Sequence, residues 1–109
     1  MATTYKILGQ SAPGTTGAVL YTVPAAGSAV VSTLIATNTN STEKTFRLYL
    51  KPTTATNAGT QHCLAYDTTI AANDSIIMTL GITLSGSAVI IVSGSTTDVA
   101  FNAFGSEIT

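Results

Sequence analysis

The chain has 109 residues and a formal net charge of −1, with 45% hydrophobic and only 8% charged residues. A nucleic-acid-binding protein needs a basic patch that displaces counterions, and four Lys and Arg residues in all are too few to form one. The composition is also too hydrophobic and too poor in charge for a disordered chain. We therefore expect residues 1–109 to fold as one domain whose surface consists mainly of Thr, Ser and small apolar side chains.

The run from Ala29 to Ala36 predicts the central strand of the fold. It is apolar at both odd and even positions, with Val31 and Ile35 on one face and Val30 and Leu34 on the other. A strand that is apolar on both faces usually lies inside a sheet and is covered on both sides.

The next segment predicts a turn followed by a half-exposed strand. Asn38–Thr42 has the composition of a hairpin turn, because Asn tolerates left-handed backbone and bonds its own main chain. Lys44–Lys51 then alternates strictly between apolar and polar positions. The inward positions are Phe46, Leu48 and Leu50, and the outward positions are Thr45, Arg47, Tyr49 and Lys51.

The whole chain predicts an all-β fold, because no segment keeps apolar residues at helical spacing. We expect about eight short strands, over residues 5–8, 18–23, 28–37, 44–51, 61–66, 75–80, 88–93 and 97–104. Strands at this spacing, separated by Gly, Pro and Asn, are typical of a single antiparallel β-sandwich, either jelly-roll or Ig-like. The segments between them are expected to be loops, including residues 53–60 and a turn-rich link over 67–74. The predicted core is Val31, Ile35, Phe46, Leu48, Ile76, Met78, Ile90 and Phe101.

A short pattern recurs at three places between strands. Val23–Ser28 and Ile70–Ser75 each contain a β-branched residue, two small residues, a turn former and Ser, and Leu84–Ser87 is a shortened version. We interpret the three as equivalent corners at which one strand is followed by the next.

Residues that could carry chemistry are few, and we predict a protein that is not an enzyme and has no catalytic, cofactor or metal site. His62 and Cys63 point to opposite faces of a strand, and zinc would need four ligands. Asp67 and Asp74 could act as paired carboxylates, but Asp in such a segment is more typical of a turn former. The single Cys excludes an intramolecular disulfide, and we expect neither a signal peptide nor a membrane span.

Four segments together resemble a known family. They are Tyr5–Gln10 (YKILGQ), Leu20–Ala25 (LYTVPA), Ala71–Asp74 (AAND) and Phe101–Ile108 (FNAFGSEI). The set is similar to small virion structural proteins of tailed bacteriophages, particularly those of cyanobacterial and marine phages.

The resemblance implies a β-sandwich that decorates a capsid or forms part of a tail. We expect a capsid decoration or cement protein that binds between capsomers and stabilises the head. Its partners would be the major capsid protein or other virion proteins, with a homo-oligomer, no nucleic acid and no membrane. It would be located in the virion after assembly in the cytoplasm of the bacterial host. A tail, baseplate or fibre component is the alternative, and a carbohydrate-binding module that uses the Tyr residues is a third reading.

The predicted interface is the outward face of the strand at 44–51, where Arg47, Tyr49 and Lys51 lie together. Arg and Tyr are common anchors in protein interfaces. A solvated sheet face, protected by its charges, explains the same pattern equally well. Tyr5 and Phe104, near the ends of the chain, are the next candidates for the interface.

Overall fold

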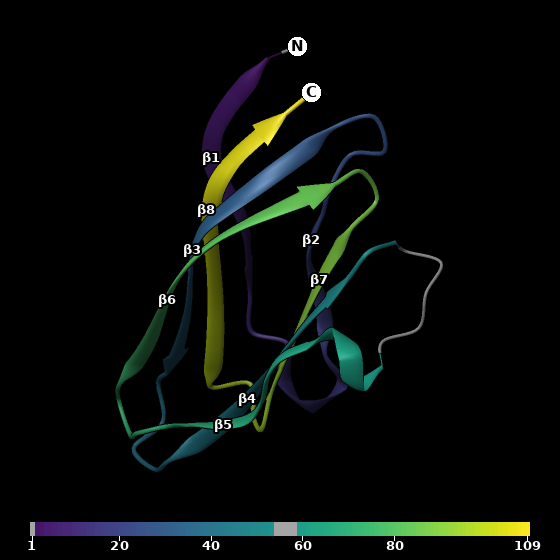
Figure 1. Ribbon diagram of the computed structural model, residues 1–109. Helices are drawn as coiled ribbons and strands as arrows, with labels where there is room; N and C mark the ends of the chain where they lie inside the picture. The colour runs from purple at the N-terminus through teal and green to yellow at the C-terminus, as the bar shows by residue number, and fades with distance from the viewer. Residues whose placement is uncertain (1, 54–58) are drawn as a thin grey trace.

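The computed structural model describes residues 2–53 and 59–109, which form two four-stranded antiparallel sheets (Figure 1). One sheet, the β1 sheet, has the order β1-β8-β3-β6, and the other, the β2 sheet, has the order β2-β7-β4-β5. The strands are β1 (Thr3–Ser11), β2 (Ala18–Thr22), β3 (Ser28–Asn38), β4 (Lys44–Lys51), β5 (Cys63–Ile70), β6 (Ser75–Ser85), β7 (Val89–Gly94) and β8 (Val99–Ile108). Two 3₁₀ turns, η1 (Gly14–Thr16) and η2 (Thr60–His62), lie in the connections before β2 and β5.

The strand order is that of a jelly roll. Strand β1 pairs with β8, β2 with β7, β3 with β6 and β4 with β5, as if one long hairpin had been rolled into two sheets. The predicted antiparallel β-sandwich is therefore confirmed, and of its two versions the jelly roll is correct. The strand that contains Ala29–Ala36, β3, lies inside its sheet between β8 and β6, as predicted.

The three recurring corners share one local structure. The first residue of each, Val23, Ile70 or Leu84, is buried in the core. In each corner the carbonyl of the second residue accepts a hydrogen bond from the amide three positions later, at 3.0 to 3.2 Å. These bonds run from Gly27 to Pro24, from Asp74 to Ala71 and from Ala88 to Ser85. Each corner carries the chain from one sheet to the other, so the sequence pattern does mark equivalent positions.

The core lies between the sheets and centres on two aromatic rings. Phe46 of β4 and Phe101 of β8 are 1% and 0% exposed and meet edge to face with their ring centroids 5.9 Å apart. Of the other predicted core residues, Val31, Leu48 and Ile90 are buried, and Ile76 and Met78 are partly buried against them.

A row of irregularities crosses the β1 sheet and changes which residues face inward. The pairing register shifts between Ile7 and Gly9 in β1, and between Val31 and Thr33 in β3. The register of β3 with β6 shifts at the same place, where Gly81 has a φ of +60°. An extra residue in a strand moves the alternation by one position. The sheet bends there, and β3 and β6 change direction near their middles (Figure 1).

The bulge in β3 overturns part of the sequence prediction. Val31 and Leu34, not Val31 and Ile35, share the inward face, while Ile35 is half-buried on the outer face with Val30. The expectation that both faces of this strand are covered is therefore wrong for the described residues.

Three further expectations are corrected by the topology. Asn38–Thr42 is not a hairpin turn, because it joins β3 of one sheet to β4 of the other. The link predicted over 67–74 is shorter, since β5 continues to Ile70. Strands β1, β6 and β8 also extend beyond their predicted ends, to Ser11, Ser85 and Ile108. Most of the loop expected at 53–60 lies outside the described residues.

Candidate functional site

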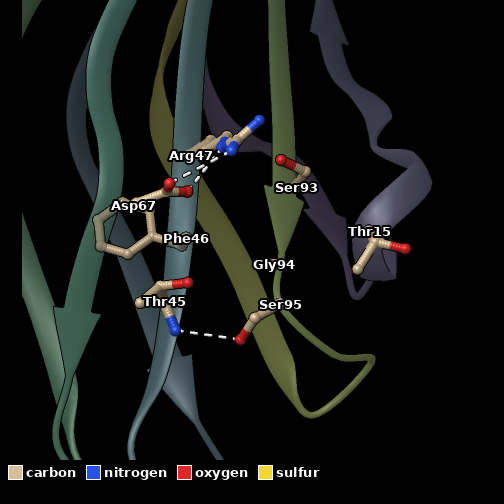
Figure 2. A pocket seen from close by; sticks show the side chains of 8 residues that line it. All are labelled: Thr15, Thr45, Phe46, Arg47, Asp67, Ser93, Gly94 and Ser95. Atoms are coloured by element: carbon tan, nitrogen blue, oxygen red, sulfur yellow. Dashed lines mark hydrogen bonds and ion pairs between the residues drawn. The ribbon is translucent and has the colours of Figure 1, made fainter.

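The outer face of β4 presents the predicted interface residues. Phe46 and Leu48 point into the core, and the intervening Arg47, Tyr49 and Lys51 are half-buried on the opposite side. Beside Arg47 lies a hollow of about 260 Å³, framed by β4, β5, β7 and η1 (Figure 2). This volume is below the range of about 300–1,000 Å³ that is usual for small-molecule sites. The hollow is therefore small for a site that encloses a ligand.

Arg47 is held in place by two neighbours from β5. Its Nε and an Nη donate to the two carboxylate oxygens of Asp67 at 2.7 and 3.2 Å, as the dashed lines in Figure 2 show. Its guanidinium carbon also lies 4.1 Å from the ring centroid of Tyr66. The bond from Arg47 holds the pKa of Asp67 below its ordinary value, and the same bond raises the pKa of Arg47. The pair fixes the direction of a long side chain that would otherwise be free to move.

The backbone of β5 explains how Asp67 reaches Arg47. Asp67 has a φ of 49°, and the register of β4 with β5 shifts between Phe46 and Leu48. A second shift follows between Leu48 and Tyr49. Bulges are a common protection of edge strands such as β5, and here the first one also aims a carboxylate at the arginine. Asp67 and Asp74 are not brought together as paired carboxylates, because Asp74 lies in the turn before β6 and bonds the amide of Ser75.

Hydroxyl groups line the rest of the hollow. The amide of Thr45 donates to Ser95 Oγ at 3.1 Å, and the amide of Ser95 donates to the carbonyl of Thr45 at 2.9 Å. Ser93 and Thr15 complete this polar wall, with Thr15 on the opposite side of the hollow from Asp67 (Figure 2).

The second pair of predicted interface residues lies on the outer face of the β1 sheet. Tyr5 and Phe104, which are 99 positions apart, border the same hollow of about 400 Å³ together with Val30. Tyr5 pairs with Ser106 and Ile7 pairs with Phe104, so Tyr5 and Phe104 lie in adjacent rows across the sheet. Tyr5 is 85% exposed, Ile7 52% and Ile77 66%, so large apolar side chains on this face are open to solvent.

Lys6 borders the same hollow but is directed elsewhere. Its ammonium lies 3.3 Å from Glu107 Oε1, and the other oxygen of Glu107 accepts a hydrogen bond from Tyr21 of the β2 sheet. The charge of Lys6 is therefore paired with Glu107 on the side of the β1 sheet that faces the β2 sheet.

The tyrosines do not form the single stacking platform that a carbohydrate-binding module would need. Tyr21 is buried, and its hydroxyl donates a hydrogen bond to Glu107. Burial is the larger cause and this bond the next in raising the pKa of Tyr21. Tyr5 lies on the outer face of the β1 sheet, whereas Tyr49 and Tyr66 belong to strands of the β2 sheet.

His62 and Cys63 also lie differently from the prediction. His62 ends η2 and is buried, and its Nδ1 accepts a hydrogen bond from the amide of Gly59 at 2.9 Å. Cys63 is half-buried at the start of β5. Within residues 2–53 and 59–109, no three His, Cys, Asp or Glu side chains lie close enough to hold a metal ion. The same residues contain no helix of the length and apolarity required to cross a bilayer.

Sequence reasoning identified the outward residues of β4 but missed the side chains that organise them. Asp67 was assigned to a turn, and neither the Tyr21–Glu107 bond nor the Arg47–Tyr66 contact has a local signal in the sequence. The first joins residues 86 positions apart in different sheets, and the second depends on the shifted register of β4 with β5.

Fold and surfaces together define a jelly-roll β-sandwich with two chemically different outer faces. The sequence matches no protein-family model and no curated protein. Among solved structures, the fold is similar to a chain in the structure of infectious bursal disease virus, Gx strain. The TM-score is 0.51 at 13% identity, over 97% of this chain and 30% of that chain. A chain from the Gt strain of the same virus matches with a TM-score of 0.48 at 12% identity, over 97% and 28%. The present chain thus spans less than a third of these proteins, and the likeness is one of fold.

Proposed function

We propose that the chain is a non-enzymatic structural protein of a tailed-phage virion, and that it acts as a capsid decoration or cement protein. The observation that carries the proposal is the strand order of the two sheets, because the jelly roll recurs in viral capsid proteins. The fold similarity to a chain of a virus structure supports it, as do the four segments that resemble phage virion proteins. Fold alone does not specify a role, so the surface must supply the rest of the argument.

The proposed docking surface is the outer face of β4, formed by Arg47, Tyr49 and Lys51. A guanidinium that is already held by Asp67 and Tyr66 loses little conformational freedom when a partner binds it. Tyr49 offers a ring and a hydroxyl between two cationic side chains, and Tyr and Arg are frequent interface anchors. We propose that this face lies against the major capsid protein at the junctions between capsomers.

Binding of this kind would stabilise the head by mass action. A protein that binds the assembled shell and not the separate subunits shifts the equilibrium toward the shell. No reaction is required of the chain, and its effect grows with its concentration relative to its dissociation constant.

The test is to locate and titrate the protein on particles of the virus that encodes it. We expect mass spectrometry to find it in purified virions and cryo-electron microscopy to place it on the head. Adding purified protein to heads that lack it should raise the temperature at which they release DNA. Absence of the protein from purified virions would overturn the proposal. Density on the tail, baseplate or fibres would replace the decoration role with the alternative one.

Variants then test the docking surface itself. Tyr49→Ala and Arg47→Ala are expected to weaken binding to heads by about tenfold or more. Tyr5→Ala removes an equally large, more exposed ring from the other sheet and serves as the comparison. Weakened binding in Tyr5→Ala, with normal binding in the other two, would move the docking surface to the β1 sheet.

A further inference from the structure

We propose that the outer face of the β1 sheet is a self-association surface, on which two copies of the chain stack their β1 sheets about a twofold axis. This inference goes beyond the proposed function, because it concerns the sheet opposite the proposed docking surface and can be tested without a particle.

Large apolar side chains are exposed on this face. Tyr5, Ile7 and Ile77 are 85%, 52% and 66% exposed, and all three come from the β1 sheet. The register places Ile77 next to Ile35 in one row and Ile7 next to Phe104 in the adjacent row, while the other two positions of each row are polar. Exposed apolar patches on a soluble protein often mark an interaction surface.

Over the part of the chain that the structure describes, the outer face of the β1 sheet is uncharged. The outward positions of β1, β8, β3 and β6, as given by the register, carry no Lys, Arg, Asp or Glu among the described residues. The remaining outward residues are mainly Ser and Thr, with the Gln10–Asn102 amide pair in the same row as Ile35 and Ile77. Two such faces can meet without bringing like charges together and without burying an unpaired charge. The outer face of the β2 sheet differs, because Arg47, Lys51 and Asp67 lie there.

The area of this face is comparable to that of a small dimer interface. The four strands contain 9 to 11 residues each. At about 4.8 Å between strands and about 3.3 Å per residue, the sheet covers roughly 600 Å² in projection. Pleats and protruding rings such as Tyr5 enlarge the accessible area of this face. A specific interface buries at least about 500 Å² on each partner and about 800 Å² at standard size, so the face is large enough for a dimer at the small end of this range.

A second copy of the chain is the partner that fits this face. An interface about a twofold axis joins the same patch on both partners, so each copy must fit its own surface. A second copy supplies an uncharged sheet of the same area, and stacking of two twisted sheets at about 30° is a standard way to pack such faces. The matching surface for this partner is therefore already present in the structure.

The experiment is sedimentation velocity of the purified chain, with variants on both outer faces. The wild type, 11.1 kDa as a monomer, is expected to sediment as a dimer. Tyr5→Lys and Ile77→Lys place a charge in the stacked face, and we expect each to raise the dissociation constant at least about tenfold. Val19→Lys is the matched control, because Val19 is 57% exposed on the outer face of the β2 sheet, and it should remain dimeric.

Circular dichroism and urea unfolding of each variant separate loss of association from loss of folding. Tyr5→Thr and Ile77→Thr replace the Lys variants if those do not fold, with a smaller rise in the dissociation constant expected. A wild-type chain that stays monomeric up to about 1 mM would overturn the inference. So would a dimer that persists in both β1-sheet variants, or one that dissociates only in Val19→Lys. The presence of the protein in virions is measured independently. A protein that is found in virions but is monomeric in solution would therefore contradict only this inference and not the proposed function.

Discussion

The hydroxyl of Tyr21 donates a 2.5 Å hydrogen bond to Glu107 Oε2, and this bond joins β2 of one sheet to β8 of the other. Glu107 Oε1 lies 3.3 Å from the ammonium of Lys6 in β1, so one carboxylate connects three strands. Its side chain is only 16% exposed. The cluster ties the two layers together near the paired ends of β1 and β8, where Ala2 and Thr109 exchange backbone hydrogen bonds.

The first prediction is that this carboxylate makes the fold sensitive to acid. The bond from Tyr21, and then the bond and charge of Lys6, hold the pKa of Glu107 below its ordinary value of 4.5. A carboxyl whose pKa is lower in the folded state stabilises the fold above its unfolded pKa, and this contribution is lost as pH falls through the folded pKa. We expect the free energy of unfolding, measured in urea, to decrease as the pH falls below about 5.

Replacement of the carboxyl should remove part of that dependence. In Glu107→Gln the unfolding free energy should be lower at pH 7 and should change less with acid than in the wild type. Glu43→Gln removes the same charge from an exposed position and should retain the full dependence. If the unfolding free energies of Glu107→Gln and the wild type changed equally with pH, the cluster of Tyr21, Glu107 and Lys6 would not contribute to the acid sensitivity. The pKa of Asp67 is also lowered, so we expect part of the acid dependence of the unfolding free energy to remain in both variants.

The second prediction concerns Asn38, a fully buried polar side chain at the end of β3. Its Nδ2 lies within hydrogen-bond distance, 2.9 to 3.2 Å, of the carbonyls of Thr42, Ile70 and Ala71, and its Oδ1 accepts from the amide of Asn40. The side chain thereby links the β3–β4 connection to the β5–β6 corner. Asn38→Ala leaves several backbone groups without this partner, so we expect a loss of about 2–3 kcal/mol in unfolding free energy.

The comparison variant for Asn38 is Gln61→Ala, which truncates an exposed amide side chain and should change stability by less than about 0.5 kcal/mol. A loss in Asn38→Ala as small as that of the control would mean that water replaces the amide at this corner.

Residue patterns within single segments predicted much of this fold. Alternation in β4 gave the correct inward and outward sets, since Phe46 and Leu48 are buried and Arg47 is not. The recurring corners were also identified correctly, because a buried first residue and an i to i+3 turn are local features. The choice between jelly-roll and Ig-like order stayed open, because strand order depends on which distant segments pair.

The errors at Ile35 and at Asn38–Thr42 have a common physical cause, because neither a bulge nor the sheet that receives the next strand is marked by a local pattern there. Ile35 was placed in the core because alternation was continued through Ser32, where β3 has an extra residue. Close packing at the bend also depends on Gly105, where a Cβ would collide with the carbonyl oxygen of Val30 on the neighbouring strand. Val30 and Gly105 are 75 positions apart, so the need for glycine at position 105 could not be inferred from the sequence around either residue.

The third prediction separates His62 from Cys63, which the sequence analysis considered together and rejected as a metal or catalytic pair. His62 Nδ1 accepts from the amide of Gly59 and the ring is buried, so His62→Leu leaves that amide unpaired. We expect a loss of about 1–2 kcal/mol in urea unfolding. Cys63→Ala should cost less, because Cys63 is a free, half-buried thiol that packs as a small apolar group. A larger loss in Cys63→Ala than in His62→Leu would contradict this assignment, and chelators should change neither result.

The fourth prediction tests the aromatic pair that joins the sheets across the core. Phe46→Ala and Phe101→Ala each remove a ring that is at most 1% exposed, and we expect a loss of about 3–5 kcal/mol from either. Phe104→Ala removes the same side chain from the outer face of the β1 sheet. It should cost clearly less when unfolding is measured at concentrations low enough to keep the chain monomeric.

The edge-to-face contact itself can be measured with milder variants that remain folded. In a double-mutant cycle of Phe46→Leu and Phe101→Leu, the two losses should not add, because the rings touch at a centroid distance of 5.9 Å. Such a pair contributes about 0.5–1.5 kcal/mol beyond its buried area, and this is the coupling energy we expect. The same cycle between Phe46→Leu and Phe104→Leu should give a coupling energy near zero, since Phe104 lies on the other side of the β1 sheet. Additive losses in the first cycle would show that each ring stabilises the core only through the area that it buries.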